Sequence, residues 1–423
     1  MAAVTAHDRL WLPYTQMKIG SPPLRAVRTE GSRIVLADGR ELIDGVASWW
    51  TACHGYNHPH IHHAVERQLA AMPHVMFGGF THEPAERLAE RLAALLPGDL
   101  NHVFFSDSGS VAVEVAMKMA VQFHLNRGVA GRTRFLAFRE GYHGDTLGAM
   151  SVCDPEESMH AHFEGWLPAQ LFAELPRSAE AAAGLDALLA ARGGEIAAVI
   201  TEPLVQGAGG MRFHDAATLA TIARLAKVHD VLLIADEIFT GFGRTGTMFA
   251  CDQAGVVPDI ACLSKALTGG TMALAATIAT DAVFDAFWSD DLAKALMHGP
   301  TFMANPLACA AANASLDLFE TEPRVAQAAA MEAELLRGLA PCPELRGVVD
   351  VRAKGAIGVV QLAAPADREA LKRSFVDRGV WVRPFGDIVY LTPSLNIGND
   401  DLCALTDAVV SVLKAQELAA EAI

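Results

Sequence analysis

The sequence has few cysteines, and they are not paired as in a disulfide framework or a metal site. Seven cysteines occur singly, none forms a C-x-x-C pair, and their number is odd. A secreted, disulfide-stabilised domain normally carries an even set at close spacing. We therefore expect reduced thiols that mostly fill the core of a cytoplasmic protein. They are Cys53, Cys153, Cys251, Cys262, Cys309, Cys342 and Cys403.

The chain also lacks a long apolar run and a run of basic residues. No uninterrupted apolar stretch is long enough to span a bilayer. Residues 1–9 lack the charged-then-apolar build of a signal peptide. The net charge is −16 at pH 7, and an acidic chain without a basic patch is not expected to bind nucleic acid or an anionic membrane surface. We expect neither a membrane nor a nucleic acid as partner.

Histidine is plentiful, but the spacing of metal ligands is missing. The chain has 16 histidines, without an H-E-x-x-H motif or a close grouping with cysteine. His58, His60, His62 and His63 lie close together. We interpret them as a turn followed by an exposed helix face rather than as a metal site, so no metal is expected.

Apolar residues are abundant and make up 52% of the 423 residues, which is enough for a large core. From about His60 onward, short apolar runs alternate with segments of helical periodicity. This alternation predicts an α/β fold with a mostly parallel sheet between helices, whose ligands bind beyond the carboxyl ends of the strands. The expected strands are residues 102–106, 134–138, 196–201, 231–235 and 260–263.

The two ends of the chain have a different character. The first sixty residues predict short strands and turns, including a hairpin around Asp38-Gly39. A long Ala-rich helix is expected from Pro306 to about Phe319, followed by an α+β segment with strands at 356–361 and 388–391. We therefore expect residues 1–60 and 306–423 to build a smaller α+β domain from both chain ends, and residues 61–305 to form the large domain.

Lys265 is a lone cation in an otherwise uncharged run, and Asp236 closes an apolar strand 29 residues upstream. Burial lowers the pKa of a lysine, so that its amine can act as nucleophile and base. A buried acid can hold a proton on a pyridine nitrogen. Together these two residues predict a site for pyridoxal 5′-phosphate (PLP), whose aldehyde condenses with the lysine amine.

Two further segments follow expected strands and suit the same cofactor. Gly109 and Ser110 begin a helix whose first N–H groups could bind a phosphate. Alone, such a pair is usually only a helix cap, but Asp236 and Lys265 favour the phosphate site. Tyr142 could cover one face of the cofactor ring, or simply pack over the edge of the sheet. Asp145 could cap the next helix or support the cofactor acid.

Other candidates have less specific signals. Glu202 ends a strand and could pair with a cation or face solvent. Tyr14, Trp49 and Trp50 could line a pocket for an extended substrate, although as core residues they need no such role. Arg383 could bind a substrate carboxylate in a two-pronged contact, or form a surface ion pair.

Taken together, these motifs resemble the class III aminotransferases of PLP fold type I over nearly the whole chain. Several segments resemble the members of that family that aminate 8-amino-7-oxononanoate in biotin biosynthesis. They are WLPYTQ at 11–16, SWW at 48–50, HGYNHP at 54–59, HVMFGGFTH at 74–82 and HGPTFMANP at 298–306.

The resemblance implies roles for the matched residues. Lys265 would bind the cofactor covalently, with Asp236 on its pyridine nitrogen and Gly109 and Ser110 on its phosphate. Thr301 would reach the phosphate of the other subunit of a homodimer. The other implied contacts are Pro300 at that phosphate, Tyr142 at both cofactor and substrate, Trp49, Trp50, Gly299 and Arg383 at the substrate, and Tyr14 as the residue that closes the pocket and assists Lys265.

The implied reaction moves an amino group from S-adenosylmethionine to 8-amino-7-oxononanoate through PLP, in two half-reactions. Three alternatives stay open. The donor could be lysine, or the chain could be a related aminotransferase for an ω-amino acid or ornithine. A non-catalytic PLP-binding regulatory protein is the alternative of another class.

Overall fold

A computed structural model describes residues 9–156, 159–163, 165–365 and 367–421. The segment 1–9, which argues against a signal peptide, therefore lies almost entirely outside the described residues. The described chain is built around a seven-stranded sheet of order β4-β12-β11-β10-β7-β5-β6. Its strands are β4 (His102–Ser106), β5 (Arg134–Phe138), β6 (Leu171–Ala173), β7 (Ile196–Thr201), β10 (Leu232–Asp236), β11 (Ile260–Leu263) and β12 (Ala275–Ala279).

The sheet is mostly parallel, as the alternation of strands and helices predicts. β12 runs antiparallel to β4 and β11, and the other pairings are parallel. Successive residues of a strand point to opposite faces, and the core clusters follow this rule. Phe135 and Ile234 pack with α4 (Gly109–Asn126) on one face, whereas Leu136 and Leu233 pack on the other with α6 (Ala179–Arg192) and α7 (Ala216–Val228).

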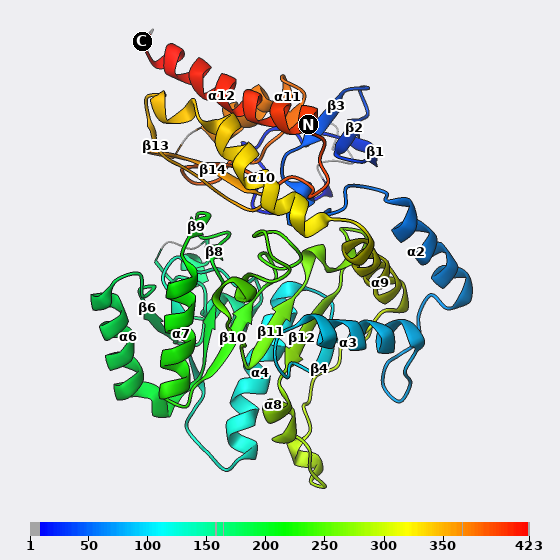
Figure 1. The fold of residues 1–423 in the computed structure, drawn as a ribbon, viewed down its shortest axis with the longest axis vertical. Helices are drawn as coiled ribbons and strands as arrows, with labels where there is room; N and C mark the ends of the chain where they lie inside the picture. The colour runs from blue at the N-terminus through cyan, green and yellow to red at the C-terminus, as the bar shows by residue number, and fades with distance from the viewer. Residues whose placement is uncertain (1–8, 157–158, 164, 366, 422–423) are drawn as a thin grey trace.

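The two ends of the chain meet on one side of this sheet (Figure 1). β1 (Ala26–Glu30), β2 (Arg33–Leu36) and β3 (Glu41–Asp44) form a sheet with the C-terminal β15 (Val380–Trp381), and β2 and β3 are the hairpin predicted around Asp38-Gly39. A second sheet has the order β13-β14-β16. Its strands and the accompanying helices are β13 (Val348–Lys354), β14 (Ile357–Leu362), β16 (Ile388–Leu391), α10 (Arg324–Leu339), α11 (Arg368–Val376) and α12 (Asn399–Glu421).

The remaining elements are short or lie between these layers. The predicted Ala-rich helix is α9 (Pro306–Thr321), and it packs against α2 and α3. The other bounds are α1 (Ala47–Trp50), α2 (Pro59–Ala71), α3 (Glu83–Leu95), α5 (Leu147–Ser151), β8 (Val205–Gln206), β9 (Arg212–Phe213) and α8 (Asp281–Asp285).

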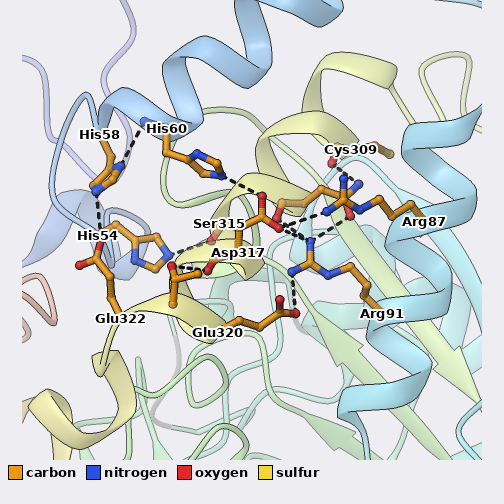
Figure 2. A network of polar contacts seen from close by, with 12 residues as sticks. His54, His58, His60, Arg87, Arg91, Cys309, Ser315, Asp317, Glu320 and Glu322 are labelled. Atoms are coloured by element: carbon orange, nitrogen blue, oxygen red, sulfur yellow. Dashed lines mark hydrogen bonds and ion pairs between the residues drawn. The ribbon is translucent and has the colours of Figure 1, made fainter.

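Asp317 on α9 ties three helices together (Figure 2). Its carboxylate accepts from His60 Nε2 of α2 at 2.8 Å. It also lies 2.9 Å from Arg91 and 3.3 Å from Arg87 of α3. Arg91 continues the network to Glu320 at 2.7 Å. The network holds α2 and α3 against the helix that packs beside Lys265.

His54 forms a second, buried link in the same region (Figure 2). Its Nδ1 accepts from Arg324 Nε at 3.2 Å, which leaves Nε2 to donate to Ser315 Oγ at 3.0 Å. Ser315 Oγ in turn lies 3.5 Å from the carbonyl of Ala266, next to Lys265. The arrangement needs a neutral imidazole, because a protonated Nδ1 cannot accept from a guanidinium.

The charge state of His54 gives a testable pH dependence. Burial, reinforced by Arg324 and His58, lowers the pKa of His54 to about 3, against about 6.5 in an unfolded chain. Between these values the unfolded chain binds the proton more strongly, so stability falls as the pH drops below about 6.5, by about 1.4 kcal/mol per pH unit from this group. Urea unfolding gives the free energy of unfolding at each pH between 6.5 and 5. The fall of this free energy with decreasing pH should be shallower in His54→Gln by about that amount per pH unit. An equal pH dependence in the variant and the wild type would contradict this account.

Candidate active site

The parallel strands deliver the predicted residues to one edge of the sheet. β4 leads to Gly109, β5 to Tyr142 and β7 to Glu202. Asp236 is the last residue of β10, and Lys265 follows β11 by two positions. The carboxyl ends of parallel strands face the same side, so this edge is where a ligand is expected.

A cavity of ≈ 920 Å³ lies over this edge. It is lined by residues from the N-terminal segment, from the sheet edge and from the C-terminal part of the chain. The predicted residues among them are Tyr14, Trp49, Trp50, Tyr142, Lys265 and Arg383. A second, shallower hollow of ≈ 480 Å³ beside α10 is lined by residues that include Thr245 and Lys354, and by none of the predicted ones.

Lys265 reaches into the cavity from a strained backbone position. Its φ of 47° is left-handed, an uncommon conformation for a residue with a side chain. Its Nζ lies 4.6 Å from the ring centre of Trp50 and 5.8 Å from that of Phe239. Burial lowers the pKa of the Lys265 amine, against the opposing charges of Asp236, Glu202 and Asp145. A lysine with a lowered pKa can lose its proton and act as a nucleophile or base.

Asp236 is held in place by a buried partner that the sequence did not identify. His143 Nδ1 donates to Asp236 Oδ2 at 2.7 Å, and Ile238 N donates to Oδ1 at 3.1 Å. Burial would lower the pKa of His143, but the hydrogen bond and charge of Asp236 outweigh it and raise that pKa. The hydrogen bond from His143 therefore holds the Asp236 carboxylate in a fixed orientation, which suits an acid that must contact a bound ring nitrogen.

Among the residues that the structure describes, Glu202 neither faces solvent nor forms an ion pair by direct contact. It is buried, and its carboxylate accepts from the backbone N–H groups of Tyr142 at 2.9 Å and Gly207 at 2.8 Å. Burial raises the pKa of Glu202 to about 7, against the opposing effect of His143. Its role is to fix the loop that carries Tyr142.

The start of α4 forms a close-fitting cradle, although Gly109 and Ser110 are not among the residues that line the cavity. Ser108 caps the helix, with Oγ accepting from Val111 N at 3.4 Å. Ser110 Oγ accepts from Asp145 N at 3.0 Å. A Cβ at Gly144, whose φ is +133°, would lie 2.3 Å from Ser110 Oγ, so only glycine fits there. Free N–H groups at a helix start attract a phosphate.

Asp145 has a different role from either of those expected from the sequence. Its carboxylate accepts from Tyr14 OH at 2.5 Å and from Tyr142 OH at 2.9 Å. The helix that follows is preceded by Thr146, and the contact with the cofactor acid is made by His143 instead. Asp145 therefore ties the N-terminal segment to the loop after β5 across the cavity mouth.

Arg383 stacks on Trp49, and it joins no ion pair at the surface with any residue of the described ranges. Its guanidinium carbon lies 4.3 Å from the ring centre of Trp49. Burial lowers the pKa of Arg383, which marks a partly desolvated cation within the cavity. Trp50 packs below, 4.5 Å from Phe239. Each of the two basic side chains, Lys265 and Arg383, thus lies over one tryptophan.

Gly299, Pro300 and Thr301 do not line this cavity in the described part of the chain. Their segment is held against α4 at a distance from its start, because Lys118 Nζ donates to the carbonyl of Met297 at 2.6 Å. Thr301 is exposed. The sequence-based assignment of these residues to the phosphate and the substrate stays a prediction that needs a second subunit.

The arrangement fits PLP in three respects. A buried amine of lowered pKa lies in the cavity. An acid backed by a histidine lies beneath the same edge. A helix start with a cradle closed to any side chain at Gly144 lies beside it. These are the groups that would hold the aldehyde, the ring nitrogen and the phosphate of the cofactor.

Comparison with known proteins agrees with this chemistry. The family model described as aminotransferase class-III matches residues 15–413. The chain belongs to the class III aminotransferases. As a member of this family it is a PLP-dependent transaminase of fold type I.

Individual relatives cover nearly the whole chain. It is 46% identical over 419 residues to the adenosylmethionine-8-amino-7-oxononanoate aminotransferase of Corynebacterium glutamicum, covering 96% of this chain and 97% of the relative. The enzyme of that name from Mycobacterium leprae is 47% identical over 412 residues, covering 95% and 94%. Among solved structures, the Methanocaldococcus jannaschii enzyme of the same name gives a TM-score of 0.93 at 34% identity and 97% coverage of both chains.

Other solved relatives have different names. A PLP-bound amine transaminase from an uncultivated Pseudomonas species gives a TM-score of 0.89 at 33% identity, covering 96% of this chain and 98% of that one. The fold alone therefore does not separate the substrates of the family.

On the exposed face of α2, His62, His63 and Glu66 place possible ligand atoms within 4.8 Å of one another, and both histidines contact Glu66. No helix in the described ranges combines the length and hydropathy needed to cross a bilayer.

Proposed function

We propose that this aminotransferase moves an amino group from S-adenosylmethionine to 8-amino-7-oxononanoate and forms 7,8-diaminononanoate, a step of biotin biosynthesis. The observation that carries the proposal is the cavity of ≈ 920 Å³, in which Trp49 lies beneath Arg383 and Tyr14 stands at the edge. It offers a cation for a carboxylate, and aromatic faces for an alkyl chain or a sulfonium. The names of the relatives support the same pair of substrates.

Each residue of the site has a separate role in the proposed reaction. PLP, when bound, supplies the electron-withdrawing ring that stabilises a carbanion. The Lys265 amine takes the proton from the α-carbon of the amino donor. Asp236, oriented by His143, keeps a proton on the ring nitrogen. Ser110 and Gly109 would hold the phosphate, and Tyr142 would contact the ring. Tyr14 closes the cavity through its hydrogen bond to Asp145.

Arg383 should anchor the carboxylate of the acceptor, which gives the first functional prediction. A charge-assisted contact of this kind contributes about 1.5–3 kcal/mol, so Arg383→Ala should slow the acceptor half-reaction by roughly ten- to a hundredfold. If Arg383 also binds the carboxylate of S-adenosylmethionine, both half-reactions will slow together in stopped-flow measurements. Arg383→Lys, which keeps the charge and loses the two-pronged geometry, should recover only part of the rate. Unchanged kinetics in both halves would remove Arg383 from the site.

A homodimer is proposed from the position of Thr301 and from exposed apolar side chains. Three large apolar side chains are more than half exposed: Phe80 at 54%, Met76 at 58% and Phe302 at 56%. A group of exposed apolar side chains is typical of a surface that binds another protein. The ring of Phe302 lies 4.6 Å from that of His74, so the two segments form one surface. We propose that a second copy covers this surface and that Pro300, Thr301 and Gly299 then reach the cavity of the partner.

Mixed dimers test that arrangement. Thr301→Ala should impair the enzyme by about tenfold through a lost phosphate contact, and Lys265→Ala should inactivate it. A dimer with one subunit of each kind has one site with both defects and one with neither, so mixing and refolding the variants should restore about half of the wild-type activity per mixed dimer. Full activity in a species that light scattering shows to be a monomer would refute the shared site.

We also propose two features alongside this function. One is the division of the chain into residues 1–60, 61–305 and 306–423, and the other is a cytoplasmic location.

The competing function is that of an aminotransferase for an ω-amino acid or ornithine. Solved transaminases at 33% and 30% identity, with TM-scores of 0.89 and 0.88, support this alternative. Steady-state assays with 8-amino-7-oxononanoate should give turnover with S-adenosylmethionine as donor. Turnover with lysine alone would assign the lysine-dependent version. Turnover only with ω-amines would support the competing reading, and none with any donor would favour a non-catalytic PLP protein.

A further inference from the structure

Both tryptophans of the cavity stand on a turn of unusual backbone conformation. Ala47, Ser48, Trp49 and Trp50 have φ values of 45°, 47°, 58° and 71°. None of them is glycine, and side chains disfavour this left-handed region. Such a run persists only where its surroundings impose it, and backbone strain of this kind gathers at functional sites.

The buried carboxylate of Asp44 supplies the contacts that impose the turn. Its Oδ1 accepts from Val46 N at 2.9 Å, and its Oδ2 accepts from Ser48 N at 2.8 Å. Tyr56 OH donates to the same Oδ2 at 2.6 Å and also bonds to Ser48 Oγ. Asp44 is only 1% exposed. Its contacts are therefore shielded from water, and the low dielectric of the interior strengthens them.

The start of the turn is fixed to the strands that carry the other side of the cavity. Gly45 N donates to the carbonyl of Trp381 at 2.9 Å, and the carbonyl of Gly45 accepts from Thr392 N at 2.7 Å. A Cβ at Gly45 would lie 3.0 Å from Leu391 Cδ2 and 3.1 Å from the carbonyl oxygen of Trp381. These contacts therefore hold the turn against the segment that leads to Arg383.

The consequence is that one turn places an aromatic ring beneath each of the two basic side chains of the site. Trp50 lies under Lys265 and Trp49 under Arg383. Trp50 is also packed against Phe239 and Tyr390. Trp49, by contrast, has one ring contact among the described residues, with Tyr14 at 6.0 Å. Its position depends on the backbone of the turn more than that of Trp50 does.

We infer that Asp44 is a positioning residue that acts through Trp49 to set the binding of the substrate at Arg383. Asp44 is not among the residues that line the cavity, and nothing in the proposed reaction uses it. The inference deepens the proposed function and rests on it for the identity of the substrates. On this inference, Asp44 controls substrate affinity from outside the cavity and has little effect on the chemical step at Lys265.

The test is a double-mutant cycle between Asp44 and Trp49 in the PLP-loaded enzyme. Asp44→Asn replaces one acceptor oxygen by an NH₂ group that faces backbone N–H donors. We expect the KM for 8-amino-7-oxononanoate to rise about tenfold, while kcat falls less than threefold. In a Trp49→Ala background the same change should have almost no further effect on KM, because the ring through which it acts is missing. Asp38→Asn, in the exposed turn of the same hairpin, is the matched control and should change neither constant.

Tryptophan fluorescence gives a readout that does not depend on turnover. Asp44→Asn should increase quenching by acrylamide in the enzyme with all six tryptophans, and this increase should disappear in Trp49→Phe. If the wild-type enzyme fails to aminate 8-amino-7-oxononanoate, the proposed substrates are wrong, but the fluorescence cycle still decides the role of Asp44.

Two results would overturn the inference. One is an Asp44→Asn effect of equal size with and without Trp49, which would mark a general structural role. The other is an unchanged KM and unchanged quenching in a folded variant. If Asp44→Asn does not fold, Tyr56→Phe removes one of the donors to the same carboxylate and takes its place in the same cycle, with a smaller expected shift of about threefold.

Discussion

Lys265→Ala is expected to abolish amino transfer, with a loss of about 10⁴-fold or more, because the variant lacks both the nucleophile and the base. The amine that is removed is the one in the cavity whose pKa burial lowers. The phosphate cradle at Ser110 and the acid at Asp236 remain in this variant, so it should still bind PLP without a covalent bond. Steady-state transfer assays and the visible spectrum of the purified variant measure the two effects.

Chemical labelling checks the same assignment in the wild-type enzyme. The purified protein should be yellow, and borohydride should bleach the colour while fixing the added mass on the peptide that contains Lys265. Normal turnover in Lys265→Ala, or mass fixed on another lysine, would show that the base has been assigned wrongly.

Asp236→Asn is the second large effect, with an expected loss of roughly 10²-fold or more, on the order of 3 kcal/mol in the barrier. The amide cannot hold a proton on the ring nitrogen by its charge, so the carbanion is less stabilised. It also loses the charge that raises the pKa of His143. Single-turnover rates of each half-reaction should therefore fall together.

A matched control separates this chemistry from damage to the fold. Asp259 is a partly buried acid beside β10, at the opposite end of the strand from Asp236. Its Oδ2 accepts from Leu233 N at 2.7 Å. Asp259→Asn should change stability without a comparable loss of rate. An effect below threefold in Asp236→Asn would mean that Asp236 is structural.

The sequence predicts the sheet and the central pair of residues because both depend on local patterns. Short apolar runs identify β5, β7 and β11 with their observed bounds, since a strand buried on both faces is a nearly continuous apolar run. Lys265 and Asp236 are recognised because a charge at the end of such a run must have a reason to be there. The antiparallel β12 has the sequence AATIA, whose alanines do not distinguish a strand from a helix, and it was not identified.

The rest of the site depends on contacts between distant parts of the chain. His143 was part of a recognised segment, but its partner Asp236 is 93 residues away. Asp145 was expected near the cofactor acid or as a helix cap, and it binds Tyr14 across 131 residues instead. The left-handed turn at 47–50 contains no glycine, so no local signal marks it. A Gly-Asp pair in the same place would have indicated it.

The central claim is that one cavity passes an amino group from S-adenosylmethionine to 8-amino-7-oxononanoate. A single-turnover experiment tests it most directly. The PLP-loaded enzyme is incubated with S-adenosylmethionine, freed of small molecules by gel filtration, and then given 8-amino-7-oxononanoate alone, with Lys265→Ala treated in parallel. Mass spectrometry should find about one 7,8-diaminononanoate per active site from the wild type and none from the variant. No diamine from the wild-type enzyme, or equal amounts without prior exposure to the donor, would contradict the account.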